Sequence, residues 1–128
     1  MPTKRWLLLI KSEIDWGLVN KYIKTVLEGF KVGANKLNEA EITSAVAGLT
    51  GWKLDGKFII KKYRFREFLQ GVAFVNVIAQ LSEEKNHHPF IAIDYKLVTL
   101  RLTSWNAGGL TDLDIVLARN YDSIYEKI

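Results

Sequence analysis

The sequence predicts an α+β fold, a two-layer sandwich in which helices cover one face of a four-stranded antiparallel sheet. Two hairpin patterns, at residues 52–65 and 91–102, each alternate apolar and polar residues around a short turn. A long stretch with helical periodicity separates the hairpins, and a capping sequence precedes a helical pattern on either side of them. The core order is therefore α-β-β-α-β-β-α, which favours one antiparallel sheet with its helices gathered on one face.

The first half of this order begins at Asn38, which with Glu41 forms an Asn-x-x-Glu capping box for a short helix that Gly48 helps to end. Asp55-Gly56 is the turn pair of the first hairpin. From Arg66 the apolar period changes from two to 3.6 and predicts a long helix to about Glu84. The residues expected along its apolar side are Phe68, Leu69, Val72, Ala73, Asn76 and Ala79.

The second half contains the other hairpin and the final helix. Alternating apolar residues predict two strands with a turn near Lys96: Ile91, Ile93 and Tyr95, then Val98, Leu100 and Leu102. Gly108-Gly109 ends this pattern, and Thr111 and Asp114 form a second capping box. The last helix has an apolar side made by Leu113, Val116, Leu117, Tyr121, Ile124 and Ile128.

The charge is distributed unevenly along the 128 residues. Residues 1–36 hold seven basic and three acidic side chains, and the rest of the chain holds eleven of each, so the whole net charge of +4 lies in the first segment. We therefore expect a basic N-terminal extension, residues 1–36, with a short strand and an amphipathic helix, and a neutral domain, residues 37–128. The chain is long enough to bury a core without disulfides, and it has no cysteine.

The same features bear on partners and location. A basic run at residues 53–66 is interleaved with aromatic residues, but strand alternation explains it more simply as a solvated sheet face, so a nucleic-acid partner is not expected. No apolar run approaches the length of a membrane span, so no membrane partner is expected either. With no cysteine and no signal-peptide pattern, the sequence favours a cytoplasmic protein.

The two histidines of the chain, His87 and His88, are adjacent and precede Pro89. Proline disfavours helical geometry in the residue before it, so the pair should lie where the long helix gives way to the third strand. Imidazoles there could donate and accept protons near neutral pH. A metal site is not expected, because adjacent histidines seldom bind one ion well and no cysteine is present. A surface loop whose histidines merely cap the helix is the remaining alternative.

A second candidate segment runs from Thr103 to Thr111. Here a strand end, a Gly-Gly turn and a capped helix place backbone N–H groups, a hydroxyl and an amide around a concave spot. The segment lacks the Lys-Ser/Thr ending of a phosphate loop and the GxGxxG spacing, so nucleotide binding has little support.

Three motifs together resemble the pterin-4a-carbinolamine dehydratase family: Glu83-x3-His87-His88-Pro89, Tyr95 six residues later, and Gly108-Gly109-Leu110-Thr111-x2-Asp114. The resemblance covers residues 37–128. It implies dehydration of 4a-hydroxytetrahydropterin to quinonoid dihydropterin in tetrahydropterin recycling, by histidine acid-base catalysis without a cofactor. It also implies catalytic roles for His87, His88 and Glu83, and a pterin pocket lined by His87, His88, Pro89, Ser104, Trp105, Asn106 and Ala107.

One departure from the family lies at Trp105, where most relatives carry a third histidine. An indole cannot transfer a proton at neutral pH, but it can stack on a pterin ring and donate one hydrogen bond. The resemblance further implies a homodimer or homotetramer. Two alternatives to an active dehydratase are a dehydratase-like module that binds a modified or molybdopterin-type pterin, and a protein-interaction or dimerisation cofactor.

Overall fold

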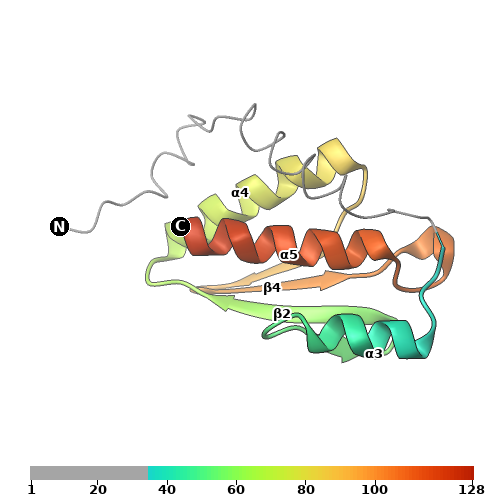
Figure 1. The fold of residues 1–128 in the computed structure, drawn as a ribbon. Coiled ribbons are helices and arrows are strands. Elements are labelled where there is room, and N and C mark those ends of the chain that lie inside the picture. The colour runs from blue at the N-terminus through green and yellow to red at the C-terminus, as the bar shows by residue number, and fades with distance from the viewer. Residues whose placement is uncertain (1–34) are drawn as a thin grey trace.

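The computed structural model describes residues 35–128 and confirms the α+β fold and its order α-β-β-α-β-β-α. Figure 1 shows the elements in sequence: helix α3 (Glu39–Ala47), strands β1 (Lys53–Asp55) and β2 (Phe58–Arg64), helix α4 (Phe68–Lys85), strands β3 (Phe90–Asp94) and β4 (Leu97–Leu102), the short 3₁₀ helix η1 (Trp105–Ala107) and helix α5 (Asp112–Lys127). The extension expected over residues 1–36 lies, apart from its last two residues, outside the described part.

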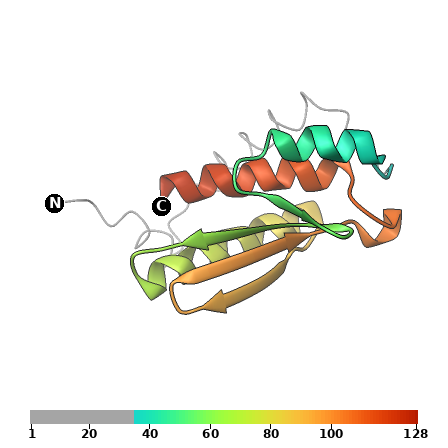
Figure 2. The same ribbon diagram turned by 90° about the horizontal axis from the view of Figure 1, so that it is seen from below.

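The four strands form one antiparallel sheet in the order β1-β2-β4-β3, with β2 and β4 in the centre. Paired residues lie on the same face, and Ile59↔Leu102 and Tyr63↔Val98 set the buried face of the central pair. Figure 2 shows the helices on one side of this sheet. Among residues 35–128, no helix combines the length and the apolar character that spanning a bilayer needs.

Both predicted capping boxes are present. The Asn38 side chain accepts a hydrogen bond from the Glu41 amide at 2.8 Å, and the Glu41 side chain accepts one from the Asn38 amide at 3.0 Å. Thr111 and Asp114 make the equivalent reciprocal pair at the start of α5. These local contacts fix where α3 and α5 begin, because they satisfy amides that lack a partner within the helix.

The long helix was predicted at the right place, but of the six residues expected on its apolar side only Ala73 is fully buried. Phe68 and Leu69 are 45% and 51% exposed, whereas Phe74, Ile78 and Leu81 are fully buried. Apolar residues occur almost all around α4, so periodicity alone cannot select the face that packs on the sheet. The large side chains that meet β2 select it instead: the rings of Tyr63 and Phe74 lie 4.9 Å apart, centre to centre.

The basic run on β2 is not a single solvated face. Lys61 points to the helical side, where its Nζ lies 2.8 Å from both Asp122 Oδ1 and the Thr50 carbonyl oxygen. Asp122 also accepts hydrogen bonds from Tyr63 Oη at 2.7 Å and Trp52 Nε1 at 3.2 Å. This polar cluster joins β2 and the start of the first hairpin to α5.

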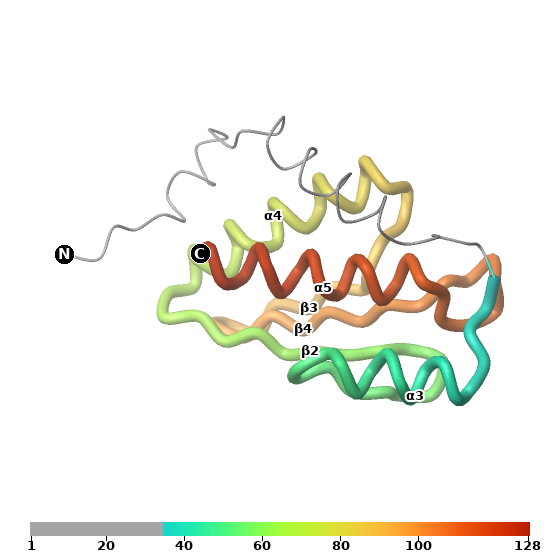
Figure 3. Tube along the Cα trace, in the orientation of Figure 1, coloured from blue at the N-terminus to red at the C-terminus, as the bar shows by residue number. Residues whose placement is uncertain are grey.

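The ends of several elements meet at one end of the sandwich. Strands β2 and β3 begin there and β4 ends there, because β4 is antiparallel to both neighbours. The C-terminal end of α4 and the N-terminal end of α5 lie at the same end, as the tube in Figure 3 shows. Both candidate segments of the sequence are therefore brought together at this end.

Candidate active site

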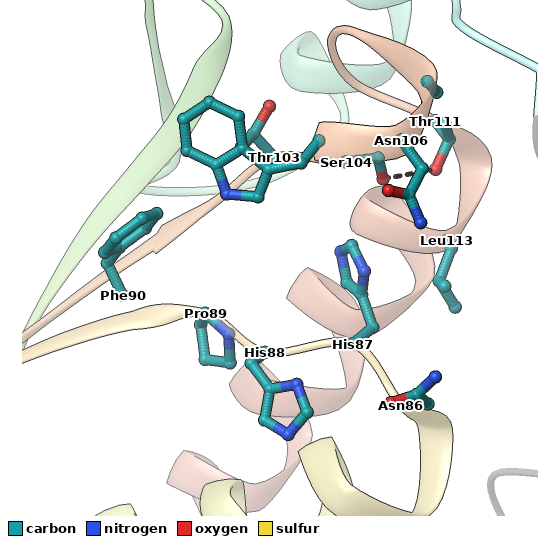
Figure 4. Close-up of a pocket in the computed structure, with 12 residues that line it drawn as sticks. Asn86, His87, His88, Pro89, Phe90, Thr103, Ser104, Asn106, Thr111 and Leu113 are labelled. Carbon is teal, nitrogen blue, oxygen red and sulfur yellow. Dashed lines mark hydrogen bonds between the residues drawn. The ribbon is translucent and has the colours of Figure 1, made fainter.

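An open cavity of about 660 Å³ lies at the end of the sheet where these elements meet. Its wall comes from two segments, one between α4 and β3 and the other between β4 and α5. The lining residues are Asn86, His87, His88, Pro89, Phe90, Thr103, Ser104, Trp105, Asn106, Ala107, Thr111 and Leu113. All seven residues proposed from the resemblance to contact a pterin are among them. Figure 4 shows this arrangement.

His87 lies deep in the cavity wall and is held by a buried carboxylate. Asn86 adopts the left-handed conformation, with φ of 49°, and ends α4, and the His87 amide donates to the Ser82 carbonyl oxygen at 3.1 Å. This turn places His87 Nε2 2.6 Å from Asp114 Oδ1. An ionised carboxylate only accepts hydrogen bonds, so this contact favours the tautomer with the proton on Nε2 and leaves Nδ1 as the acceptor nitrogen of the ring.

Asp114 has a second function beyond the capping predicted for it. Its side chain is fully buried, and Oδ2 accepts hydrogen bonds from Ser104 Oγ at 2.7 Å and the Thr111 amide at 2.9 Å. Sequence reasoning missed the contact with His87, since the capping box alone accounted for the residue. The available signal was its place in the third motif, in the first turn of a helix that follows the cavity-lining segment.

His88 has a carboxylate partner as well, but an exposed one. Its Nε2 lies 2.7 Å from Glu83 Oε2, and the two side chains are 55% and 78% exposed. In Figure 4 the His88 ring points away from Ser104, Asn106 and Thr111, whereas the His87 ring points toward them. Glu83, for which the resemblance implies a catalytic role, thus contacts His88.

The opposite wall of the cavity is supplied by η1 and its flanking turn. Gly108 ends η1 with φ of 77°, a conformation that glycine adopts without strain. Ser104 and Gly109 are paired across this turn by backbone hydrogen bonds of 3.1 and 3.2 Å. Trp105 at the start of η1 is 70% exposed, and its ring contacts Phe58 and Phe90.

The residues around the cavity offer acid-base groups and hydrogen-bond partners. Two imidazoles, each with a carboxylate on Nε2, lie on one wall of the cavity, and Ser104, Asn106 and Thr111 lie on the other. Within residues 35–128, no group of three or more His, Cys, Asp or Glu side chains is placed to hold a metal ion. Such an arrangement can move protons on a bound molecule.

The fold and this site define a small α+β protein with two histidine–carboxylate pairs beside a cavity at one end of its sheet. The model of the family described as Pterin 4 alpha carbinolamine dehydratase matches residues 35–124. The chain belongs to the pterin-4a-carbinolamine dehydratase family.

In relatives that are named for this family, the match extends over nearly the whole length of the relative. A protein from Thermomicrobium roseum is 44% identical over 84 residues, which are 66% of this chain and 90% of the relative. One from Sulfurisphaera tokodaii is 39% identical over 89 residues, which are 70% of this chain and 96% of the relative. The matched region thus corresponds to a complete small protein in each of these organisms.

Two solved structures resemble the described domain. The transcriptional coactivator/pterin dehydratase from Brucella melitensis superimposes with a TM-score of 0.67 at 33% identity, covering 70% of this chain and 98% of that one. A pterin dehydratase-like protein identified as a RuBisCO assembly factor in the alpha-carboxysome gives a TM-score of 0.51 at 27% identity, covering 59% and 89%. The fold is therefore shared by proteins that are described as having different roles.

Proposed function

We propose that this chain dehydrates 4a-hydroxytetrahydropterin to quinonoid dihydropterin and water, within tetrahydropterin recycling in the cytoplasm. The observation that carries the proposal is the His87–Asp114 pair, with its buried 2.6 Å contact, on the wall of a cavity that also holds every other residue expected to contact a pterin. The family to which the chain belongs supports the reaction class.

In the proposed reaction His87 is the base. The proton on ring nitrogen 5 of the substrate moves to His87 Nδ1, and Asp114 stabilises the imidazolium that forms, because its buried carboxylate already accepts the Nε2 proton. The electron pair released at nitrogen 5 forms the new double bond to carbon 4a. The carbon–oxygen bond at that carbon breaks, and the hydroxyl group leaves.

His88 is the acid in this scheme. Its Nδ1 supplies the proton that turns the departing hydroxyl into water, while Glu83 contacts Nε2 and orients the ring. The two histidines thus carry out opposite proton transfers on one flat substrate. In this scheme Ser104 and Asn106 bind its polar edge, and Pro89 and Ala107 contact its faces. Their presence in the cavity lining supports these roles.

The test is a turnover assay with freshly made 4a-hydroxytetrahydropterin. The wild-type protein should accelerate loss of the carbinolamine, and His87→Ala and His88→Ala should each slow it by roughly 10² to 10⁴. Asn76→Ala, an exposed position on α4 away from the cavity, is the control and should keep full activity. No acceleration by the wild-type protein would contradict the enzymatic proposal.

A second candidate function is pterin binding without turnover, and Trp105 is the observation in its favour. Where most relatives have a third histidine, this chain presents a 70% exposed indole. A modified or molybdopterin-type pterin could occupy such a site as a ligand. Calorimetric binding of a stable pterin by a protein that shows no turnover would select this function. Trp105→His separates the two further, since it should change the rate of an active dehydratase.

We also infer that residues 37–128 carry the chemistry and that the basic segment 1–36 serves a separate role. The family match that begins at residue 35 supports this division. The buried Leu37 donates its amide to the Leu110 carbonyl oxygen at 2.8 Å, and this contact supports a domain that begins near residue 37. Deletion of residues 1–34 should leave turnover unchanged.

Finally, we propose that two copies pair through β3 to form a homodimer. This strand lies at the edge of the sheet, and all five of its residues are exposed, including Phe90, Ile91 and Ile93. An apolar strand at the edge of the sheet formed by residues 35–128 favours pairing with a second strand. A second copy of the chain can supply that strand, and the two copies then form a symmetric dimer.

A further inference from the structure

We propose that Phe58 and Arg101, neither of which lines the cavity, are positioning residues that hold the Trp105 indole as a fixed wall of the substrate site. The proposal rests on the function proposed above and extends it to the residues that determine pterin affinity. It follows from a cluster on the outer face of the sheet, opposite the helices, which we call the aromatic cluster: Phe58, Phe90, Arg101 and Trp105.

The three rings of the aromatic cluster contact one another in pairs. Phe58 lies 5.7 Å from Phe90 and 5.8 Å from Trp105, centre to centre, and Phe90 lies 6.2 Å from Trp105. The interplanar angles are 62°, 81° and 77°, so every pair is edge-to-face, the geometry that aromatic rings favour. Each ring is thereby held at an angle fixed by the other two.

Arg101 holds this cluster against the sheet. It pairs with Phe90 across β3 and β4 and with Ile60 across β2 and β4, which places it between the neighbouring strands on the outer face. Its guanidinium carbon lies 4.3 Å from the centre of the Phe58 ring and 5.6 Å from that of Phe90. These are cation–π distances, and they tie both phenylalanines to a central strand.

Trp105 needs such support, because its own backbone provides little. It lies on a three-residue 3₁₀ helix that ends at a left-handed glycine, and its side chain is 70% exposed. An indole on so short an element is free to change rotamer unless its edge is packed. The contacts with Phe58 and Phe90 pack one side of the ring and leave the rest open to the cavity.

The consequence for the reaction concerns affinity rather than proton transfer. When a flat heterocycle stacks on an indole that is already fixed, the protein loses less conformational freedom than when the indole must first be ordered. His87 and His88 lie on the other wall, and Asp114 is buried behind His87. Loosening the cluster should therefore raise KM and leave kcat and its pH profile unchanged.

The experiment compares Phe58→Leu with Phe58→Tyr and with Phe68→Leu, a matched control in which an exposed phenylalanine on α4 loses its ring. Phe58→Leu should raise KM about threefold to tenfold, the scale of one aromatic pair, and Phe58→Tyr should restore it. Phe68→Leu should behave as wild type. An unchanged KM in Phe58→Leu, or an equal fall in kcat in both leucine variants, would overturn the proposal.

A second readout does not depend on turnover. In protein labelled with 5-fluorotryptophan, the ¹⁹F resonance of Trp105 is assigned by its loss in Trp105→Phe. It should move in Phe58→Leu but not in Phe68→Leu, before any ligand is added, and addition of 6-methylpterin should shift it in wild type. If the wild type binds 6-methylpterin but shows no turnover of the carbinolamine, the proposed reaction is wrong. The Kd of 6-methylpterin then replaces KM in the comparison of the variants. A Trp105 resonance unmoved by Phe58→Leu overturns the positioning role.

Discussion

At the scale of single residues, the two histidines differ in the carboxylate that each one contacts. Asp114 is fully buried with three further donors around Oδ2, whereas Glu83 is 78% exposed. Water and salt screen an exposed ion pair, so it contributes little, and a buried charge-assisted hydrogen bond is much stronger. The structure therefore offers a matched comparison between two carboxylates on equivalent ring nitrogens.

Asp114→Asn should lower kcat by roughly 10² to 10⁴, the scale of a positioned acid-base group. The amide oxygen of asparagine can still accept from Ser104 and Thr111, but its NH₂ group then faces His87 Nε2 and requires that nitrogen to be the acceptor. The proton moves to Nδ1, which can no longer take one from the substrate. Steady-state kinetics on the purified variant measures the effect.

Glu83→Gln is the control for this prediction and should change kcat only a few-fold. Circular dichroism of both variants should match the wild type, since asparagine preserves the cap of α5 and Glu83 is exposed. Equal losses in the two variants would contradict the assignment of His87 as the base supported by a buried carboxylate.

The residues of the site could largely be named from the sequence, because they fall in two short segments with recognisable motifs. The cavity collects all of those expected to contact a pterin. What the sequence could not show is contact between distant positions. Asp114 had a complete local explanation as a cap, and Phe58 is separated from Trp105 by a helix and two strands. Only the folded sheet brings them together.

At the scale of elements, the cluster around Asp122 joins the central strand β2 to α5. Tyr63 is buried and donates to Asp122 at 2.7 Å. Burial, together with this hydrogen bond, raises the pKa of Tyr63 well above its usual value. Burial also raises the pKa of Tyr121, which lies next to Asp122 on α5. Ionisation of either phenol is thus coupled to unfolding.

Tyr63→Phe should therefore reduce the alkaline loss of stability. Below pH 10 both folded and unfolded Tyr63 are neutral; above it the unfolded phenol ionises while the folded one stays protonated, so the free energy of unfolding falls as pH rises, by about 1.4 kcal/mol per pH unit for one group. The variant removes this contribution and, at neutral pH, costs about 1 kcal/mol for the lost hydrogen bond. Urea titrations between pH 8 and 11.5 measure both effects.

The control for this titration is Tyr95→Phe. Tyr95 is 68% exposed in the turn between β3 and β4, so its substitution should keep the wild-type slope with pH. An identical alkaline slope in Tyr63→Phe and wild type would show that the β2–α5 contact does not carry the coupling.

The elements themselves were predictable where local chemistry determines them. Two capping boxes and two hairpin turns gave the starts and ends of most elements, and each is present in the structure. The buried face of α4 was not predictable, because an apolar helix can pack any of several sides. Lys61 was misplaced for a related reason: its long side chain reaches Asp122 from a strand face that is otherwise apolar.

At the scale of the whole molecule, the sheet has two unlike edges. Strand β1 has only three residues, whereas β3 has five, all exposed and mostly apolar. A short edge discourages pairing and a longer apolar one favours it. The proposed homodimer thus has a definite place on the molecule.

Substitution of Ile91 and Ile93 together by lysine should dissociate the proposed homodimer into monomers. Their side chains are 37% and 41% exposed on the edge strand, and like charges brought together across a symmetric interface repel. Sedimentation velocity measures the change. Leu54→Lys on β1, where the side chain is 51% exposed, is the matched control and should leave the mass unchanged. Dissociation by Leu54→Lys alone would move the interface to the other edge.

The register of the β3–β4 hairpin also has a consequence for the evolution of the site. Phe90 and Arg101 are paired across the hairpin. Phe90 directly follows Pro89, and Arg101 comes four residues before Trp105, so the strand alignment sets the distance between the two cavity walls. An insertion of two residues in the turn at Tyr95 and Lys96 lengthens the hairpin away from the site and leaves this spacing intact. A deletion of one residue within β3 or β4 instead turns every later side chain to the opposite face. Length variation should thus be tolerated at the far tip and selected against along the strands.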